Sequence, residues 1–145
     1  MRESGILMHI TSLPGPYGIG SLGSQAYAFV DFLKKAGQRK WQLLPLTPTG
    51  FGDSPYQSCS AFAGNPYLID LTFLAEAGLL KREALDGICW SDTHDRVNFG
   101  LQYEHRQKVL KMAYSRFEEQ EDFQQFCRDN SFWLSDFSLF QALKE

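Results

Sequence analysis

Two short apolar runs, residues 5–13 and 41–46, stand near the start of the chain. Neither run alternates polar with apolar residues, which is typical of strands in a parallel sheet that is covered on both faces. The residues between them have helical apolar spacing: Leu22, Ala26, Phe29, Val30 and Leu33. The order strand, helix, strand predicts an α/β fold.

The expected first helix has recognisable start and stop signals. Ser21 or Ser24 is a candidate N-cap, because a hydroxyl can accept a bond from a free backbone N–H of the first turn. Lys34 and Lys35 favour the negative end of the helix, and Gly37 suits the left-handed position that follows it.

The second half of the chain is predicted to be helical. Five segments have the spacing or composition of helices: residues 71–80, 82–85, 101–119, 123–130 and 133–143. Asp70 is the expected N-cap of the first, and Gly78 is expected to break it. The long helix is expected to bury Val109, Leu110, Ala113 and Phe117. The acidic residues 118–122 are expected to form a solvated junction.

Composition excludes several classes of protein. The net charge of -3 offers no basic surface for nucleic acid, and no apolar stretch approaches the ~18 residues of a membrane span. The start of the chain has too short an apolar stretch for a secretion signal. Cys59, Cys89 and Cys127 are odd in number and widely spaced, which favours a reducing compartment and predicts a cytoplasmic protein.

The most informative segment is the long loop, residues 47–70, which follows the second apolar run. It mixes Gly and Pro with four aromatic residues, Phe51, Tyr56, Phe62 and Tyr67, and carries almost no charge. A loop of this length is usually functional or disordered, and disordered segments lack aromatics. Rings interleaved with Ser, Gln, Asn and Asp suit a sugar, and a strand's carboxyl end is where α/β folds bind ligands.

Gly18, Gly20 and Gly23 spell the glycine motif of a dinucleotide site. Two details argue against that interpretation. Residues 13–17 separate the motif from the strand, and the second strand does not end in the acidic residue that binds a ribose. Glycines in a tight loop are the preferred interpretation, and a nucleotide-binding oxidoreductase is kept only as a minor alternative.

Histidines and cysteines do not suggest a metal site. His9 lies inside the first apolar run and is expected to be a core residue, with a ligand contact at the strand end as the minor alternative. His94 and His105 fall in polar surroundings and are expected at the surface. No spacing of His, Cys or carboxylates is typical of metal ligands, so we predict neither metal nor cofactor.

The two carboxylates near the long loop and the aromatic residues near the end of the chain are interpreted as structural rather than catalytic. Asp53 is expected to form a turn and Asp70 to cap a helix, so neither is a candidate catalytic acid. Trp133, Phe137 and Phe140 form an aromatic stripe at helical spacing, which is expected to pack against a part of the protein outside this chain.

The motifs GILMHITSLPGPYGIGSLG and WQLLPLTPTGFGDSPYQSCSAFAGNPYLIDL closely resemble the N-terminal part of the amylomaltases, the 4-alpha-glucanotransferases also called disproportionating enzymes. Weaker similarity continues through GLQYEHRQKVL and WLSDFSLFQALK. The resemblance implies the first two strands of a (β/α)₈ TIM barrel, an incomplete barrel here, with a helical inserted subdomain. Residues 1–80 would belong to the barrel and its long loop, and residues 81–145 to the truncated helical subdomain.

The resemblance also implies an activity: transfer of α-1,4-glucan segments between maltodextrins by a retaining double displacement, as part of starch and glycogen metabolism. Tyr56 of the SPYQ motif would pack against the sugar at the cleavage point, with Ser54 and Ser58 in support. Phe51 would lie on a second glucan contact, where relatives often have tyrosine. The family's catalytic acids match no residue of this chain, so the isolated chain is expected to be inactive. The alternative is a non-catalytic glucan-binding α/β fragment.

Overall fold

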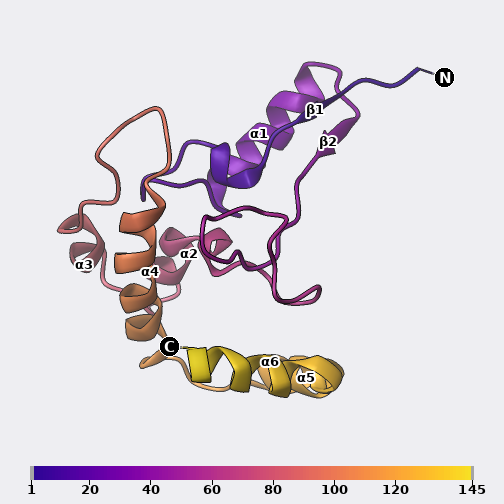
Figure 1. Cartoon of the computed structure of the whole chain (residues 1–145). Coiled ribbons are helices and arrows are strands. Elements are labelled where there is room, and N and C mark those ends of the chain that lie inside the picture. Colours follow the sequence, from indigo (N-terminus) through magenta and orange to yellow (C-terminus); the bar gives the residue numbers. More distant parts are fainter. Residues whose placement is uncertain (1, 145) are drawn as a thin grey trace.

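A computed structural model describes residues 2–144 of the chain (Figure 1). In chain order the elements are β1 (Gly5–Leu7), η1 (Ile10–Ser12), α1 (Ser24–Lys35), β2 (Lys40–Gln42), η2 (Pro66–Leu68), α2 (Leu71–Glu76), α3 (Arg82–Asp86), α4 (Phe99–Tyr114), α5 (Glu121–Asp129) and α6 (Ser131–Lys144). Figure 1 shows α1 beside the two strands, α2 to α4 grouped together, and α5 with α6 below them. None of the described helices is long and apolar enough to cross a membrane.

The strands β1 and β2 pair in parallel, with Ile6 opposite Trp41. The predicted α/β character and strand direction are confirmed, but the predicted extents, residues 5–13 and 41–46, were too long. The first run leaves the sheet because the His9 ring accepts a bond from Thr11 N and starts the 3-10 helix η1. The second run contains Pro45, which has no N–H to donate to a ladder.

The prediction that both faces of this sheet are buried was wrong for the described residues. Ile6 and Leu7 are 37% and 57% exposed. On the α1 side, the ring of Phe29 meets that of Trp41 edge-on, with centroids 4.9 Å apart. Strand side chains become buried only where a second layer covers them, and α1 covers only part of this two-stranded sheet.

The helix α1 ends as predicted but begins differently. Gly37 has a φ of 72°, the left-handed conformation expected after the helix. Its N-cap is Gly23, so neither Ser21 nor Ser24 caps it as predicted. Of the predicted buried face, Ala26 and Leu33 are buried, Phe29 is half-buried, and Leu22 and Val30 are exposed.

The hydrophobic core gathers residues from α2, α3, α4 and the segments between them. Its buried members are Leu71, Leu80, Leu85, Trp90, Val109 and Ala113. The Trp90 indole donates to Leu85 O at 3.1 Å, so its polar atom is satisfied inside the core. The core therefore combines residues from both sides of position 80. The division into residues 1–80 and 81–145 stays a prediction.

Several predicted helix bounds shifted. The helix α4 runs over residues 99–114 rather than 101–119, because Asn98 accepts a bond from Leu101 N and the chain leaves the helix after Ser115. Phe117, predicted to be buried on this helix, packs against Phe123 instead. The helix α2 ends before Gly78, whose φ is 77°. Part of the acidic junction forms the first turn of α5, where carboxylates favour the positive end of the helix.

Candidate functional site

The long loop between β2 and α2 is closed at its base by a backbone hydrogen bond. Asn65 N donates to Leu46 O at 2.8 Å, and the side chain of Asn65 caps η2 by accepting a bond from Tyr67 N at 2.9 Å. Pro48 is buried just inside this closure. The two ends of the loop are therefore held together, and residues 49–64 project from a fixed base.

Residues 50–57 form a compact turn at the tip of the loop. Gly50 N donates to Gln57 O at 3.0 Å, and Asp53 N donates to Gly50 O at 3.1 Å. Gly52 and Asp53 have φ values of 91° and 54°, a left-handed region that Asp tolerates better than most residues. The Thr49 hydroxyl donates to the Asp53 carboxylate at 3.3 Å. These bonds confirm the prediction that Asp53 forms a turn.

The structure brings two of the predicted site residues, Phe51 and Tyr56, together on this turn. Phe51 is fully exposed, and Tyr56 is 73% exposed. Aromatic rings normally bury much of their surface in a core or at an interface. Two rings held in solvent by an ordered turn therefore offer flat apolar surfaces to a ligand.

The other two predicted residues, Ser54 and Ser58, bind their own loop. The Ser54 hydroxyl accepts a bond from Tyr56 N at 3.4 Å. The Ser58 hydroxyl donates to Ser60 O at 2.8 Å and accepts from Ser60 N at 3.2 Å. Such local bonds fix the backbone without a sheet or helix. Both serines hold the loop in shape, and the hydroxyl of Ser54 can still donate its proton to a ligand.

The ring of Phe62 packs against α6. Its centroid lies 5.2 Å from that of Phe132, edge-on, and 5.9 Å from that of Trp133, stacked. Phe137 follows Trp133 along the stripe, and their centroids are 6.0 Å apart. The aromatic stripe was predicted to face a part of the protein outside this chain. Trp133 thus contacts the long loop within this chain, and packing of the stripe against a part outside the chain stays a prediction.

The glycine motif serves close packing. A Cβ at Gly20 would overlap Ile10 O, and a Cβ at Gly23 would overlap the Asp70 carboxylate. That carboxylate accepts the hydroxyl of Ser21 at 2.6 Å and caps α2 by accepting a bond from Thr72 N. The start of α1 already has a negative group beside it, which would repel a pyrophosphate. The geometry supports the prediction of packing glycines.

Gln102 and Arg106 on α4 form a buried polar network that the sequence analysis missed. Gln102 Nε2 donates to Tyr17 O at 2.7 Å and to Trp90 O at 3.2 Å. Arg106 donates to Pro66 O, to Ile69 O and to Gln102 Oε1. Burial lowers the pKa of Arg106 to about 10, against the opposing attraction of Asp70. Helical spacing backwards from Ala113 and Val109 leads to Arg106 and Gln102, a signal that could have revealed them.

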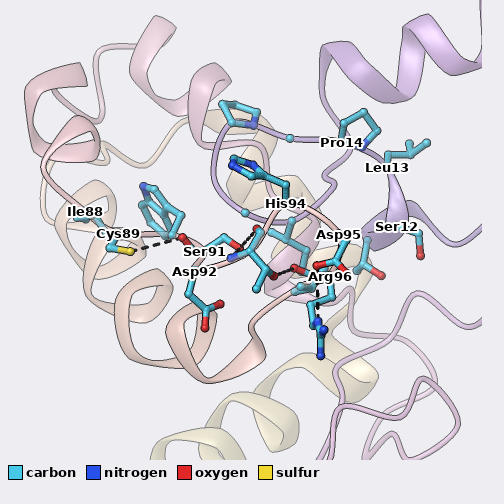
Figure 2. Close-up of a pocket in the computed structure, with 18 residues that line it drawn as sticks. Ser12, Leu13, Pro14, Ile88, Cys89, Ser91, Asp92, His94, Asp95 and Arg96 are labelled. Carbon is cyan, nitrogen blue, oxygen red and sulfur yellow. Dashed lines mark hydrogen bonds and ion pairs between the residues drawn. The ribbon is translucent and has the colours of Figure 1, made fainter.

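A cavity of about 780 Å³ lies between residues 11–19 and residues 88–97 (Figure 2). Several polar groups around it bind one another. Ser91 Oγ donates to Thr93 O at 2.6 Å, and Asn98 Nδ2 donates to the Asp92 carboxylate at 3.0 Å. The second bond lowers the pKa of Asp92 below its usual range. Among the described residues, no buried side-chain polar atom lacks a partner.

Two of the three histidines differ from the predictions, because His9, expected in the core, and His105, expected at the surface, are both half-buried. His9 is half-buried, and its Nε2 lies 3.3 Å from Pro45 O, so it joins the ends of the two apolar runs. His94 is exposed, as predicted. His105 was predicted at the surface but is half-buried, edge-on to Trp90. Within residues 2–144, no three His, Cys or acidic side chains are grouped closely enough to hold a metal ion.

Comparisons with known proteins agree on one family. The sequence profile of the 4-alpha-glucanotransferases matches residues 8–145. The chain is 52% identical over 139 residues to a 4-alpha-glucanotransferase of Clostridium butyricum, covering 94% of this chain and 28% of the relative. It is 52% identical over 149 residues to one from Thermus thermophilus, covering 99% of this chain and 29% of the relative.

A solved structure gives the same result. The chain superimposes on an amylomaltase from Streptococcus agalactiae in complex with acarbose with a TM-score of 0.91 and 45% identity. The match covers 99% of this chain and 30% of that one. The chain thus spans less than a third of the length of these relatives.

Proposed function

Because the chain belongs to the 4-alpha-glucanotransferase family, we propose that it forms part of the glucan-binding site of a transferase that moves segments of α-1,4-glucans between maltodextrins. The reaction would be a retaining double displacement, in which a carboxylate first takes the glycosyl group and a second sugar then receives it. The similar amylomaltase from S. agalactiae was solved in complex with acarbose, and this supports binding of an oligosaccharide.

One observation carries the proposal: the exposed rings of Tyr56 and Phe51 are held on an ordered turn. A sugar presents C–H groups on one face and hydroxyls at its edge, so it can stack on a ring while polar groups bind its rim. Tyr56 would face the sugar at the cleavage point, where its ring would also attract a developing oxocarbenium ion. Phe51 would stack on a second glucan segment, without the hydroxyl of a tyrosine.

Ser54 and Ser58 would support this surface. Each is bonded within the loop, which lowers the cost of ordering the loop when a glucan binds. A cavity of about 320 Å³ adjoins the loop, lined in part by Tyr67, Tyr103 and Gln107, and it would extend the surface available to a chain of sugars. Polar side chains beside rings are typical of such sites.

The fold proposal follows from strand direction. Two parallel strands joined by a helix are the repeating unit of a (β/α)₈ barrel, and β1 and β2 would be the first two strands of such a barrel. The long loop then follows the carboxyl end of the second strand, the face on which barrel enzymes carry their active sites. Residues 81–145 would form a helical subdomain beside that face.

Catalysis would need acids that these residues do not provide. The Asp70 oxygens bind Ser21 and the start of α2, and Asp53 shapes the tip of the loop. Neither is free to act as nucleophile or proton donor, so the acids would come from residues outside this chain. The second candidate function, glucan binding without catalysis, rests on the same observation.

The cysteines indicate the compartment in which the protein would act. Cys59, Cys89 and Cys127 are unpaired thiols, which supports a cytoplasmic location.

The proposed activity is tested by incubating the intact protein that carries this chain with maltotriose. Glucose together with longer maltodextrins is the result expected of a transferase. Binding of maltotriose without products would favour the non-catalytic alternative. The absence of both binding and products would overturn the proposal.

A further inference from the structure

Arg106 is an unusual residue for the interior of this chain. It is 1% exposed. None of the salt bridges found among the described residues involves Arg106. A buried cation is costly unless several oxygens surround it. Here they are carbonyl oxygens and an amide oxygen, with the charge of Asp70 near enough to favour the cation.

The carbonyl oxygens that Arg106 binds belong to a single short segment. Arg106 Nε donates to Pro66 O at 3.3 Å, and its Nη2 donates to Ile69 O. These residues begin and directly follow η2, the turn that Asn65 caps while closing the base of the long loop. A planar guanidinium binds two acceptors in one fixed orientation, so it fixes the angle of this turn as well as its position.

Gln102 extends the same connection to a second part of the chain. It accepts a bond from Arg106 Nη1 at 3.3 Å and donates to Tyr17 O at 2.7 Å. One turn of α4 thus holds both the base of the long loop and the loop that follows β1. Gln102 and Tyr17 are separated by 85 positions in sequence and are joined by this one side chain.

We propose that Arg106 is a positioning residue for glucan binding, which acts by holding the base of residues 47–70 so that Tyr56 and Phe51 meet the sugar in the bound orientation. This rests on the proposed function of those two rings. Arg106 itself need not touch the sugar at the cleavage point. A loop that is held before binding loses less conformational freedom when the ligand arrives.

The test compares three variants in the intact protein that carries this chain. Arg106→Met keeps length and removes the donors, and Arg106→Lys keeps a charge that can bind at least one carbonyl. Arg116→Met is the matched control, because Arg116 also donates to a carbonyl, Leu79 O at 3.1 Å, which lies outside residues 47–70. The two readouts are hydrogen exchange of residues 47–70 and the steady-state constants for a maltooligosaccharide.

We expect Arg106→Met to exchange faster in residues 47–70 than the wild type and to raise KM about tenfold, because a loop released from these bonds must be ordered again when the glucan binds. A tenfold change corresponds to ~1.4 kcal/mol. The kcat should change far less, Arg106→Lys should recover part of the affinity, and Arg116→Met should leave both readouts unchanged. A merely structural role would lower the thermal stability of the variant without this split between KM and kcat.

Three results would overturn the proposal: unchanged exchange in residues 47–70, faster exchange with an unchanged KM, or equal effects of Arg106→Met and Arg116→Met. Hydrogen exchange is measured without glucan, so it separates the two hypotheses. Faster exchange in a protein that neither binds nor converts maltooligosaccharides would mean that Arg106 holds the loop but the proposed function has failed, and the positioning role would fail with it.

Discussion

The Ser21 hydroxyl donates a 2.6 Å hydrogen bond to Asp70 Oδ2, which joins the start of α1 to the start of α2 across 49 residues of sequence. The other oxygen of the same carboxylate accepts bonds from Thr72 N and Phe73 N and so caps α2. The Asp70 carboxylate lies in the space that a side chain at position 23 would occupy. The carboxylate thus fits only because position 23 is a glycine.

Gly23→Ala is therefore expected to destabilise the protein. The added Cβ would overlap the Asp70 carboxylate, and forcing extra volume into a packed site costs about 1–3 kcal/mol. The matched control is Gly87→Ala, since nothing lies within 4 Å of a Cβ at Gly87 and its φ is negative. Urea unfolding measures both variants. Equal stabilities of the two variants would contradict the packing described for Gly23.

Tyr56→Ala is expected to lower kcat/KM for a glucan about tenfold or more. Loss of ring stacking and of attraction to a developing cation together removes about 1–3 kcal/mol. Tyr114→Ala is the control, because Tyr114 at the end of α4 is 74% exposed, almost the same as Tyr56. The measurement is kcat/KM with maltotriose in the intact protein. A loss of the same size in Tyr114→Ala would show that exposure of tyrosines, rather than their location, explains the effect.

The pKa of Asp53 is expected to lie above the usual carboxyl value, and the pKa of Asp92 is expected to lie below it. Burial raises the pKa of Asp53, although its bond from Thr49 opposes the change. The bond from Asn98 is the main cause that lowers the pKa of Asp92. Carbon-detected NMR of the side-chain carboxyls measures both, and Asn98→Ala should bring the pKa of Asp92 back towards 3.8.

The signs of the two contributions to stability also differ. Asp53 is easier to protonate in the folded state, so its contribution is fully present below pH 3.8 and is lost as the pH rises through its raised pKa. Asp92 is harder to protonate, so its contribution is present above pH 3.8 and is lost as the pH falls through its lowered pKa. Asp53→Asn should remove the first dependence and leave the second. The opposite order of the two titrations would contradict these assignments.

Residues 1–145 on their own are expected to show no transferase activity. Asp70 is committed to Ser21 and α2, and Asp53 is committed to the tip turn. A retaining transfer needs two carboxyl groups about 5–5.5 Å apart on either side of the scissile bond. The measurement is chromatography of products from maltotriose with the purified chain. Glucose and longer maltodextrins appearing together would contradict the account of both carboxylates.

The sequence predicted the elements whose signals are local. The capping role of Asp70, the left-handed Gly37 and the buried face at Val109 and Ala113 depend on a few neighbouring residues, and all three are confirmed. The unusual mixture of glycines, prolines and aromatics drew attention to the long loop as a whole, and the resemblance to the amylomaltases singled out Phe51 and Tyr56 within it. Both rings are exposed on one turn, and their role in binding a ligand stays a prediction.

The rest depends on contacts between distant residues. Neither the Arg106 bonds to Pro66 O and Ile69 O nor the packing of Phe62 against Trp133 follows from local spacing. The apolar runs at 5–13 and 41–46 predicted longer strands, because hydrophobicity alone does not reveal where His9 and Pro45 end the pairing. These limits come from the local bond of His9 and from Pro45, which a hydrophobic pattern does not reveal.

The central claim is that residues 47–70 hold a glucan through the ring of Tyr56. The most direct measurement is a crystal structure of the intact protein soaked with a maltooligosaccharide. The account predicts a sugar ring stacked on Tyr56 in the wild type, and a weaker or absent sugar at that position in Tyr56→Ala. A well-ordered sugar bound elsewhere, with residues 47–70 empty in the wild type, would contradict it.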